Sequence, residues 1–98
     1  MATLIVSYPL TDGARFDREY YLSTHIPLAR SVWVESGLQS AEVLFPAVGL
    51  QPLAGLVILR FNNQAGIDAA LTDPRTAEVI GDVANFTNIA PMIFRADD

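Results

Sequence analysis

The chain has 98 residues, of which 51% are hydrophobic and 17% charged, and this composition excludes a disordered protein and leaves room for one domain, residues 1–98. Eleven acidic residues against six basic ones give a net charge of -5, which argues against nucleic acid and an anionic membrane surface as partners. There is no cysteine, no export signal and no apolar run of the ~20 residues that a membrane helix needs, so we expect a cytoplasmic protein.

The first predicted elements are a strand and a long helix. Residues 3–8 are mostly β-branched, aromatic or apolar and precede Pro9, which is typical of a strand that runs into a turn. Residues 16–35 form a predicted helix, because apolar and aromatic residues recur there at spacings of four, three and four. The residues of this stripe are Tyr21, His25, Leu28 and Val32.

Pro27 interrupts this helix. Its ring removes the backbone hydrogen bond back to Ser23, which predicts a bend near His25 and Ile26. Gly37 is the expected end of the helix, because glycine readily adopts the left-handed conformation found there.

The second half of the chain predicts two strands, a split helical region and a last strand. Residues 41–45 and 55–61 are the two strands, and we expect them to pair as antiparallel neighbours. Asn63 is the expected N-cap of the next helix. The Asp-Pro pair at 73–74 repeats the start signal, so this region should divide into two helices. The last strand covers residues 90–95.

This order of elements predicts an α+β fold of the ferredoxin-like βαββαβ type, with a four-stranded antiparallel sheet and both helices on one face. The runs 4–6, 43–45 and 56–59 are apolar on both sides, so both sheet faces should be dry. A second copy packed on the open face would make a dimeric α/β barrel, a homodimer through the sheet face. The alternative cover is the loop 46–54 folding back over that face.

His25 is the only histidine and the first candidate for chemistry. A side chain with a usual pKa of about 6.5 is suited to proton transfer near neutral pH. The alternative is a core histidine whose ring is satisfied by a neighbouring backbone carbonyl.

The other candidates are aromatic and amide side chains. Tyr20, Tyr21 and Trp33 bring aromatic surface with polar tips to one helix, which suits either a pocket for a flat ligand or core packing. The segment 85–88, Asn-Phe-Thr-Asn, offers donors for a substrate carbonyl or caps for the helix and turn. One histidine without cysteine argues against a transition-metal site, and the glycine-rich loops that bind dinucleotides or phosphates are absent, so we expect no metal and no cofactor.

Two stretches, separated by two strands, together resemble the EthD family. They are Arg15-Phe16-Asp17 with Tyr20-Tyr21-Leu22, Thr24-His25 and Ile26-Pro27-Leu28, and then Asp82 with Asn85-Phe86-Thr87-Asn88-Ile89 and Pro91. The resemblance covers nearly the whole chain and implies a ferredoxin-like dimer with a small-molecule pocket between sheet and helices. It also implies that His25 is a pocket residue with Tyr21, Phe86 and Asn88 as companions.

Similar dimeric barrels include muconolactone isomerases, cofactor-independent monooxygenases, dehydratases and decarboxylases. The first hypothesis is therefore a cofactor-free enzyme acting by proton transfer on a small cyclic or aromatic carbonyl compound, with His25 as the catalytic residue. Asn88 or a tyrosine hydroxyl would polarise the carbonyl. The rival hypotheses are a noncatalytic binding or accessory protein for a hydrophobic metabolite, and a purely structural dimer. The predicted ligand-binding residues are Tyr20, Tyr21, Trp33, Phe86 and Asn88.

Overall fold

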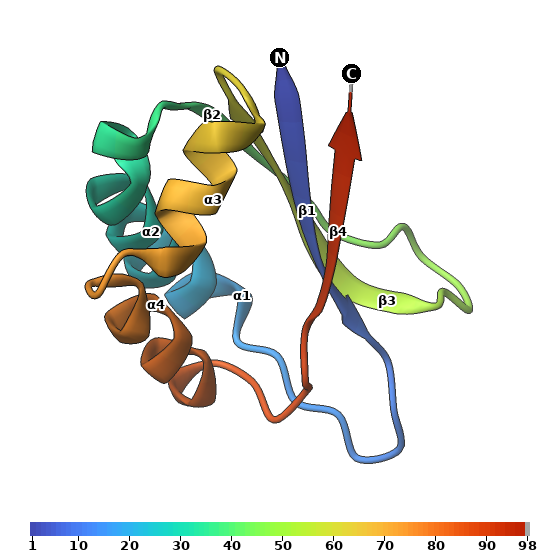
Figure 1. The fold of residues 1–98 in the computed structure, drawn as a ribbon. Helices are drawn as coiled ribbons and strands as arrows, with labels where there is room; N and C mark the ends of the chain where they lie inside the picture. Colours follow the sequence, from blue (N-terminus) through green and yellow to red (C-terminus); the bar gives the residue numbers. More distant parts are fainter. Residues whose placement is uncertain (98) are drawn as a thin grey trace.

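A computed structural model describes residues 1–97 of the chain. Its centre is a four-stranded sheet with the strand order β2-β3-β1-β4, in which every neighbouring pair is antiparallel. The strands are β1 (Ala2–Pro9), β2 (Leu38–Leu44), β3 (Leu53–Phe61) and β4 (Met92–Asp97). The predicted ferredoxin-like arrangement is confirmed, and β1 and β3 are the two central strands (Figure 1).

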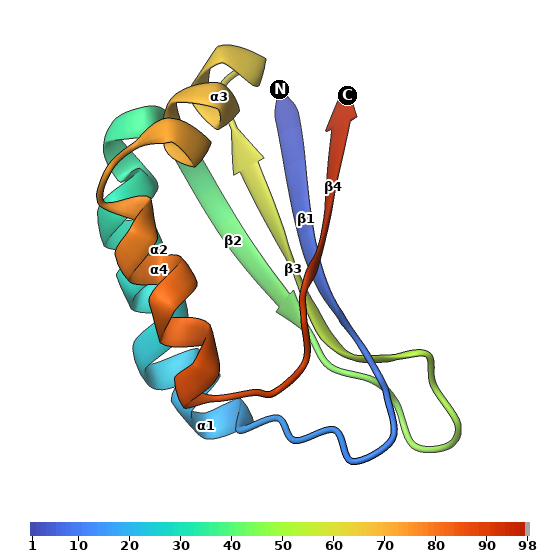
Figure 2. The same cartoon turned by 60° about the horizontal axis from the view of Figure 1, so that its bottom comes forward.

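The helices lie together on one face of the sheet (Figure 2). The first region joins α1 (Arg18–Tyr20), a π-helical turn η1 (Tyr21–His25), α2 (Ile26–Trp33) and a 3-10 turn η2 (Val34–Ser36). The second region consists of α3 (Gln64–Thr72), α4 (Thr76–Asp82) and a 3-10 turn η3 (Val83–Asn85), so the predicted split at 73–74 is confirmed. Within residues 1–97, no helix has the length and apolar character needed to span a bilayer.

Short polar side chains and one glycine set the ends of these helices. The carboxylate of Asp17 accepts the N–H of Tyr20 at 3.0 Å, and the amide oxygen of Asn63 accepts the N–H of Gly66 at 2.9 Å, as its predicted role as N-cap requires. Gly37 has a φ of 98°, a left-handed conformation that costs glycine little. The chain therefore passes directly from the first helical region into β2.

The core fills the space between the sheet and the helices. The largest fully buried side chains are Tyr8, Tyr21, Phe61, Phe86, Leu4, Leu59, Ile67 and Val32. At one end of the core, the rings of Tyr8, Phe16, Tyr21 and Phe86 pack edge-to-face or tilted, with centroids 5.0 to 5.7 Å apart. This aromatic cluster positions η1 against β1.

The opposite face of the sheet carries apolar side chains that the described chain leaves uncovered. We call this the outer sheet face, and its apolar residues are Ile5, Leu44, Leu56, Ile58, Met92 and Phe94. Met92 and Phe94 are each 62% exposed. The loop between β2 and β3 does not fold back over it, because Val48 and Leu50 near the loop tip are fully exposed. The alternative cover considered from the sequence is therefore wrong.

Candidate functional site

The predicted bend in the first helical region is a π-helical turn. The N–H of Ile26 bonds to the carbonyl of Tyr21, five residues back, and Pro27 has no N–H with which to continue the α-helical pattern across this point. Such turns are rare and occur frequently at functional sites. Here the turn brings both Tyr21 and His25 to the sheet side of the helix, where both are buried.

His25 forms a close pair with Asp82 at the end of α4. The two atoms that meet are His25 Nδ1 and Asp82 Oδ2, 2.9 Å apart. The other carboxylate oxygen accepts the hydroxyl of Tyr20 at 2.6 Å and the amide of Asn85 at 2.9 Å. A carboxylate can only accept, so Nδ1 carries the proton and Nε2 is left with a free lone pair. His25 is thus a buried histidine, as the alternative expected, but the partner of its ring is a carboxylate and not a backbone carbonyl.

Burial and the Asp82 carboxylate act on His25 in opposite directions. Only 5% of His25 is exposed, and burial lowers its pKa below the usual 6.5, although the hydrogen bond and charge of Asp82 oppose this shift. The ring stacks on Tyr21 at 5.5 Å and packs against Phe86 at 4.5 Å, measured between ring centroids. At neutral pH the imidazole is therefore uncharged and held in one orientation.

The pKa of Asp82 is also displaced. Burial of its carboxyl group tends to raise this pKa, but the hydrogen bonds from Tyr20, Asn85 and His25 outweigh that effect and hold it below 3.8. In return, the carboxylate raises the pKa of Tyr20 above 10. Asp82 thus stays ionised and Tyr20 stays protonated, so the contact between them persists at neutral pH.

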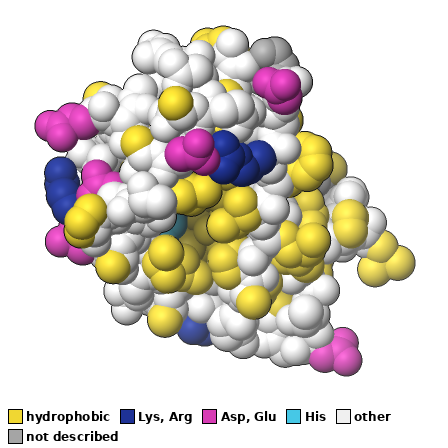
Figure 3. All heavy atoms as spheres, in the orientation of Figure 1, with side chains coloured by type: hydrophobic (Ala, Val, Ile, Leu, Met, Phe, Trp, Pro, Cys, Tyr) yellow, Lys and Arg dark blue, Asp and Glu magenta, His cyan; other side chains and the backbone are white. Residues whose placement is uncertain are grey.

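An apolar cavity of about 90 Å³ lies between the sheet and the helices, with His25 in its wall. Three exposed apolar side chains, Leu71, Ile80 and Ile93, lie around it on α3, α4 and β4. In Figure 3, hydrophobic side chains gather around a hollow between helices and sheet, and the histidine is visible within it. Nε2 has no hydrogen-bond partner among residues 1–97, so it is the ring atom that can meet a ligand.

Two tyrosines line the same cavity. Tyr8 comes from β1 and Tyr21 from η1, and burial raises the pKa of Tyr8 to about 12 and that of Tyr21 well above its usual 10. Both hydroxyls therefore keep their protons and can donate. The hydroxyl of Tyr21 is fully buried and lies close enough to that of Tyr8 to oppose the rise in the pKa of Tyr8.

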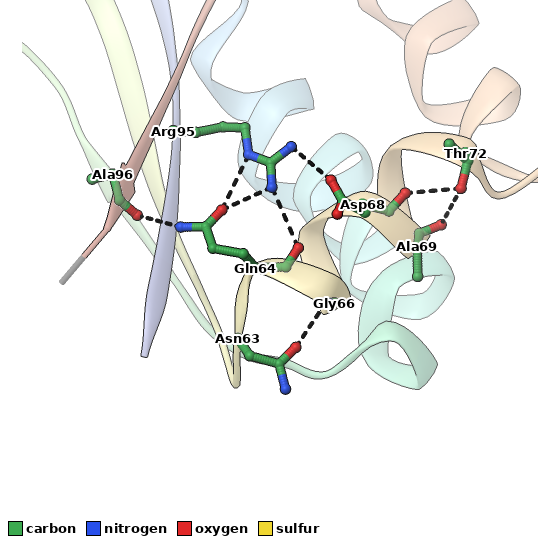
Figure 4. A network of polar contacts seen from close by, with 8 residues as sticks. All are labelled: Asn63, Gln64, Gly66, Asp68, Ala69, Thr72, Arg95 and Ala96. Atoms are coloured by element: carbon green, nitrogen blue, oxygen red, sulfur yellow. Dashed lines mark hydrogen bonds and ion pairs between the residues drawn. The ribbon is translucent and has the colours of Figure 1, made fainter.

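Polar contacts beside the cavity tie the edge strand β4 to α3 (Figure 4). Arg95 of β4 donates to the side-chain oxygen of Gln64 at 2.8 Å and to the carboxylate of Asp68 at 2.9 Å. Gln64 in turn donates to the carbonyl of Ala96 at 2.9 Å. These bonds hold β4 against the helix layer near the C-terminal end of the strand.

The structure brings some of the predicted site residues to the cavity and leaves others outside. His25, Tyr21 and Trp33 line it, and the Trp33 indole donates to the hydroxyl of Thr76 at 2.8 Å. Phe86 lies behind His25 rather than in the wall, and Tyr20 holds Asp82 from the outer side.

Asn88 lies away from this site. Its side-chain oxygen accepts the N–H of Arg15 at 2.8 Å, and its amide donates to the carbonyl of Gly13 at 3.0 Å. The side chain thus ties the segment after β1 to the segment before β4, which is the capping role considered as its alternative. Its amide has no contact with the cavity.

Sequence reasoning missed the role of Asp82, which lies 57 positions from His25. Two signals were available: Asp82 begins the second stretch that resembles the EthD family, and it follows buried Val79 by three residues and so lies near the buried stripe of α4. Tyr8 and Thr76 were missed as cavity residues as well. No group of three or more His, Asp or Glu side chains in residues 1–97 is placed to hold a metal ion.

Solved structures of other proteins share this fold. No protein-family model matches the chain, and no curated protein matches it. Among solved structures, an EthD-like protein from Ralstonia eutropha JMP134 shares 30% sequence identity with a TM-score of 0.80, over 98% of this chain and 89% of that one.

Two more distant solved structures share the fold alone. A dimeric protein of unknown function with a ferredoxin-like fold, from Bacteroides fragilis, is 14% identical with a TM-score of 0.63, over 99% of this chain and 95% of that one. SnoaB, a cofactor-independent oxygenase from Streptomyces nogalater, is 9% identical with a TM-score of 0.68, over 99% of this chain and 93% of that one. Proteins with this fold therefore include dimers and an oxygenase that works without a cofactor.

Proposed function

We propose that this chain, which belongs to the EthD family, is a cofactor-free enzyme. It would act by proton transfer on a small cyclic or aromatic carbonyl compound. The observation that carries the proposal is the pair of His25 and Asp82, 2.9 Å apart, in the wall of an otherwise apolar cavity. A buried, uncharged imidazole with a carboxylate behind it is the arrangement of a general base.

The proposed step is removal of a proton from the carbon next to a carbonyl. Nε2 of His25 takes the proton, the C–H electron pair moves into a new carbon–carbon double bond, and the carbonyl oxygen becomes an enolate. Asp82 stabilises the imidazolium that forms, because its carboxylate accepts the hydrogen bond from Nδ1–H throughout and stays ionised. Return of the proton to another carbon gives isomerisation, and an electron-rich enolate can also react with oxygen. The Streptomyces oxygenase supports the proposal, because it is a cofactor-independent enzyme of the same fold.

Hydrogen exchange tests this step without knowledge of the natural substrate. In D₂O, the protein should replace the hydrogens next to the carbonyl of cyclohexanone by deuterium, which proton NMR follows as loss of signal. A His25→Gln variant should lose about 100-fold or more of this rate, although its amide can still donate to Asp82. Ser23→Ala changes an exposed hydroxyl on the same turn and should keep the wild-type rate.

The exchange experiment also separates the proposal from its alternative. A noncatalytic protein that holds a hydrophobic metabolite in a catabolic pathway would use the same apolar cavity. Binding of cyclohexanone without exchange above the buffer rate would support that alternative. A folded His25→Gln variant that exchanges as fast as wild type would remove His25 from the mechanism.

The proposed assembly is a homodimer through the outer sheet face, in the cytoplasm. The register of the strands places Ile5, Ile58 and Phe94 side by side, and this apolar surface has no cover in the described chain. Exposed apolar patches of this kind favour association, and the Bacteroides neighbour supports the proposal because it is a dimer of the same fold.

Sedimentation measures this assembly directly. Phe94→Glu places a charge in the proposed interface and should convert the dimer to a monomer at micromolar concentration. Val34→Glu changes a side chain of similar exposure, 59% against 62%, in η2 on the helix layer and should leave the dimer intact. A wild-type protein that sediments as a stable monomer would refute the assembly.

A further inference from the structure

Tyr20 reaches the pair of His25 and Asp82 from outside the cavity. Its hydroxyl donates to Oδ1 of Asp82 at 2.6 Å, whereas His25 meets Oδ2 at 2.9 Å. A distance this short between a hydroxyl and a carboxylate is typical of the strong hydrogen bonds that charged groups form. The carboxylate on α4 therefore connects Tyr20 at the end of α1 to the imidazole ring in η1.

The backbone and the ring of Tyr20 are held as well. Its N–H donates to the carboxylate of Asp17, the N-cap of α1, at 3.0 Å. Its ring stacks on that of Phe86 with a centroid distance of 6.4 Å, and the Phe86 ring packs against His25 at 4.5 Å. Tyr20 is thus fixed at three points, and two of them lead to His25.

The carboxylate of Asp82 depends on its donors, because only 11% of its side chain is exposed. Tyr20 and Asn85 both donate to Oδ1, at 2.6 Å and 2.9 Å, so the carboxylate cannot turn Oδ2 away from His25 without loss of these bonds. Breaking bonds to a largely buried charged group is costly. The closer of the two donors, Tyr20, therefore has the larger part in setting the direction of the carboxylate.

Among residues 1–97, Asp82 is the charged group that meets the His25 ring. The other titratable side chains of the cavity wall are Tyr8 from β1 and Tyr21 from η1, and both keep their protons because burial raises their pKa. The negative charge of Asp82 favours a protonated imidazole, and a donor on its far oxygen counters part of that charge. The hydroxyl of Tyr20 thus acts together with burial to keep the ring uncharged.

We propose that Tyr20 is a positioning residue of the proton-transfer site, which aims Oδ2 of Asp82 at His25 and limits the pull of this carboxylate on a second proton for the imidazole ring. This inference rests on His25 being the base proposed above. Tyr20 does not line the cavity, so it acts through Asp82 and not on the substrate. Its effect is to leave Nε2 of His25 bare and ready to accept the substrate proton.

Tyr20→Phe tests this role, because it removes the hydroxyl and keeps the ring that stacks on Phe86. NMR titration of ¹⁵N-labelled histidine follows His25 alone, since the chain has one histidine. We expect the pKa of His25 to rise, with an affinity for the proton at least about threefold above wild type, because the carboxylate regains the charge that the hydroxyl countered. In the hydrogen-exchange assay, the fall in rate toward acid should move to higher pH by the same factor. An unchanged or lower pKa of His25 in folded Tyr20→Phe would overturn the inference.

Two further variants separate this role from a purely structural one. Ser31→Ala removes a hydroxyl on α2 that donates to the carbonyl of Leu28 at 2.7 Å, a bond of similar length without a link to Asp82, and should leave the pKa of His25 unchanged. Asn85→Ala removes the second donor to Oδ1 and should raise this pKa by less than Tyr20→Phe does, because its bond is longer. A larger rise in Asn85→Ala would give the role to Asn85 and refute the assignment of Tyr20. A lower Tm in Tyr20→Phe, with His25 titrating as in Ser31→Ala, would show that the hydroxyl serves the fold alone.

This inference and the proposed enzyme fail in different ways. A pKa of His25 that rises in Tyr20→Phe, in a protein without any hydrogen exchange, would uphold the link from Tyr20 to His25 and refute the enzyme. Exchange that depends on His25, with the pKa unmoved in Tyr20→Phe, would uphold the enzyme and refute the role of Tyr20.

Discussion

Replacement of Asp82 by asparagine separates the charge of this residue from the space it fills. Oδ2 of the carboxylate lies 2.9 Å from Nδ1 of His25 and keeps the proton on that nitrogen. The other oxygen accepts hydrogen bonds from Tyr20 and Asn85. The new amide keeps an oxygen for Tyr20 and Asn85 but turns its NH₂ group toward Nδ1. The imidazole must then carry its proton on Nε2, where it can no longer accept one from a substrate.

The expected effects on stability and on rate differ widely in size. All three hydrogen bonds can re-form in Asp82→Asn, but they then join neutral groups and are weaker than the bonds to a carboxylate. We therefore expect the free energy of unfolding to fall by only about 1 kcal/mol. The rate of hydrogen exchange in cyclohexanone should fall about 100-fold or more, because the base has been removed. Urea unfolding gives the first quantity, and proton NMR in D₂O gives the second.

A matched control uses an aspartate that pairs with an arginine. Asp68→Asn removes a carboxylate that contacts Arg95 at 2.9 Å, is largely exposed and does not line the cavity. This variant should keep the wild-type exchange rate. The reasoning is refuted if folded Asp82→Asn exchanges within about threefold of wild type, since loss of a general base costs far more than that.

The remaining predictions concern pH and two glycines. Because burial lowers the pKa of His25 below 6.5, the exchange rate should be constant above that pKa and fall as the pH drops through it; a rate that rises toward acid would contradict an uncharged base. The unfolded chain binds this proton more strongly, so the free energy of unfolding, measured with urea, should also fall below about pH 6.5. In Gly66→Ala a Cβ would clash with the carbonyl of Ser36, so the free energy of unfolding should fall by about 1–3 kcal/mol. Gly81 has open space around it, so in Gly81→Ala the free energy of unfolding should rise by up to about 1 kcal/mol. Equal effects in urea unfolding would contradict the packing of α3 described above.

The sequence was most informative where neighbouring residues decide the structure. The short apolar and β-branched segments and their order predicted the sheet, and the N-cap at Asn63 with the Asp-Pro pair at 73–74 predicted the divided helix. Pro27 predicted the bend at His25, because the loss of its N–H is a local effect. The strand ends differ from expectation by at most three residues, as in β2, which begins at Leu38, directly after the turn at Gly37.

The site was harder to predict because its contacts join distant parts of the chain. The partner of His25 comes from α4, and no local pattern marks Asp82 as the carboxylate that faces the imidazole. The adjacent Tyr20 and Tyr21 also diverge, since the first reaches Asp82 and the second enters the core. Asn88 has the chemistry of a carbonyl donor, but it satisfies backbone groups of two segments that only the fold brings together.

The protonation state of His25 is the point on which the proposed chemistry depends, and this chain offers it to measurement with one labelled residue. Histidine labelled with ¹⁵N gives signals from a single imidazole, whose two nitrogens report separately whether they carry a proton. We predict a protonated Nδ1 and a bare Nε2 at pH 7, with the Nε2 signal shifting when cyclohexanone is added. A proton on Nε2, or on both nitrogens, would contradict the account.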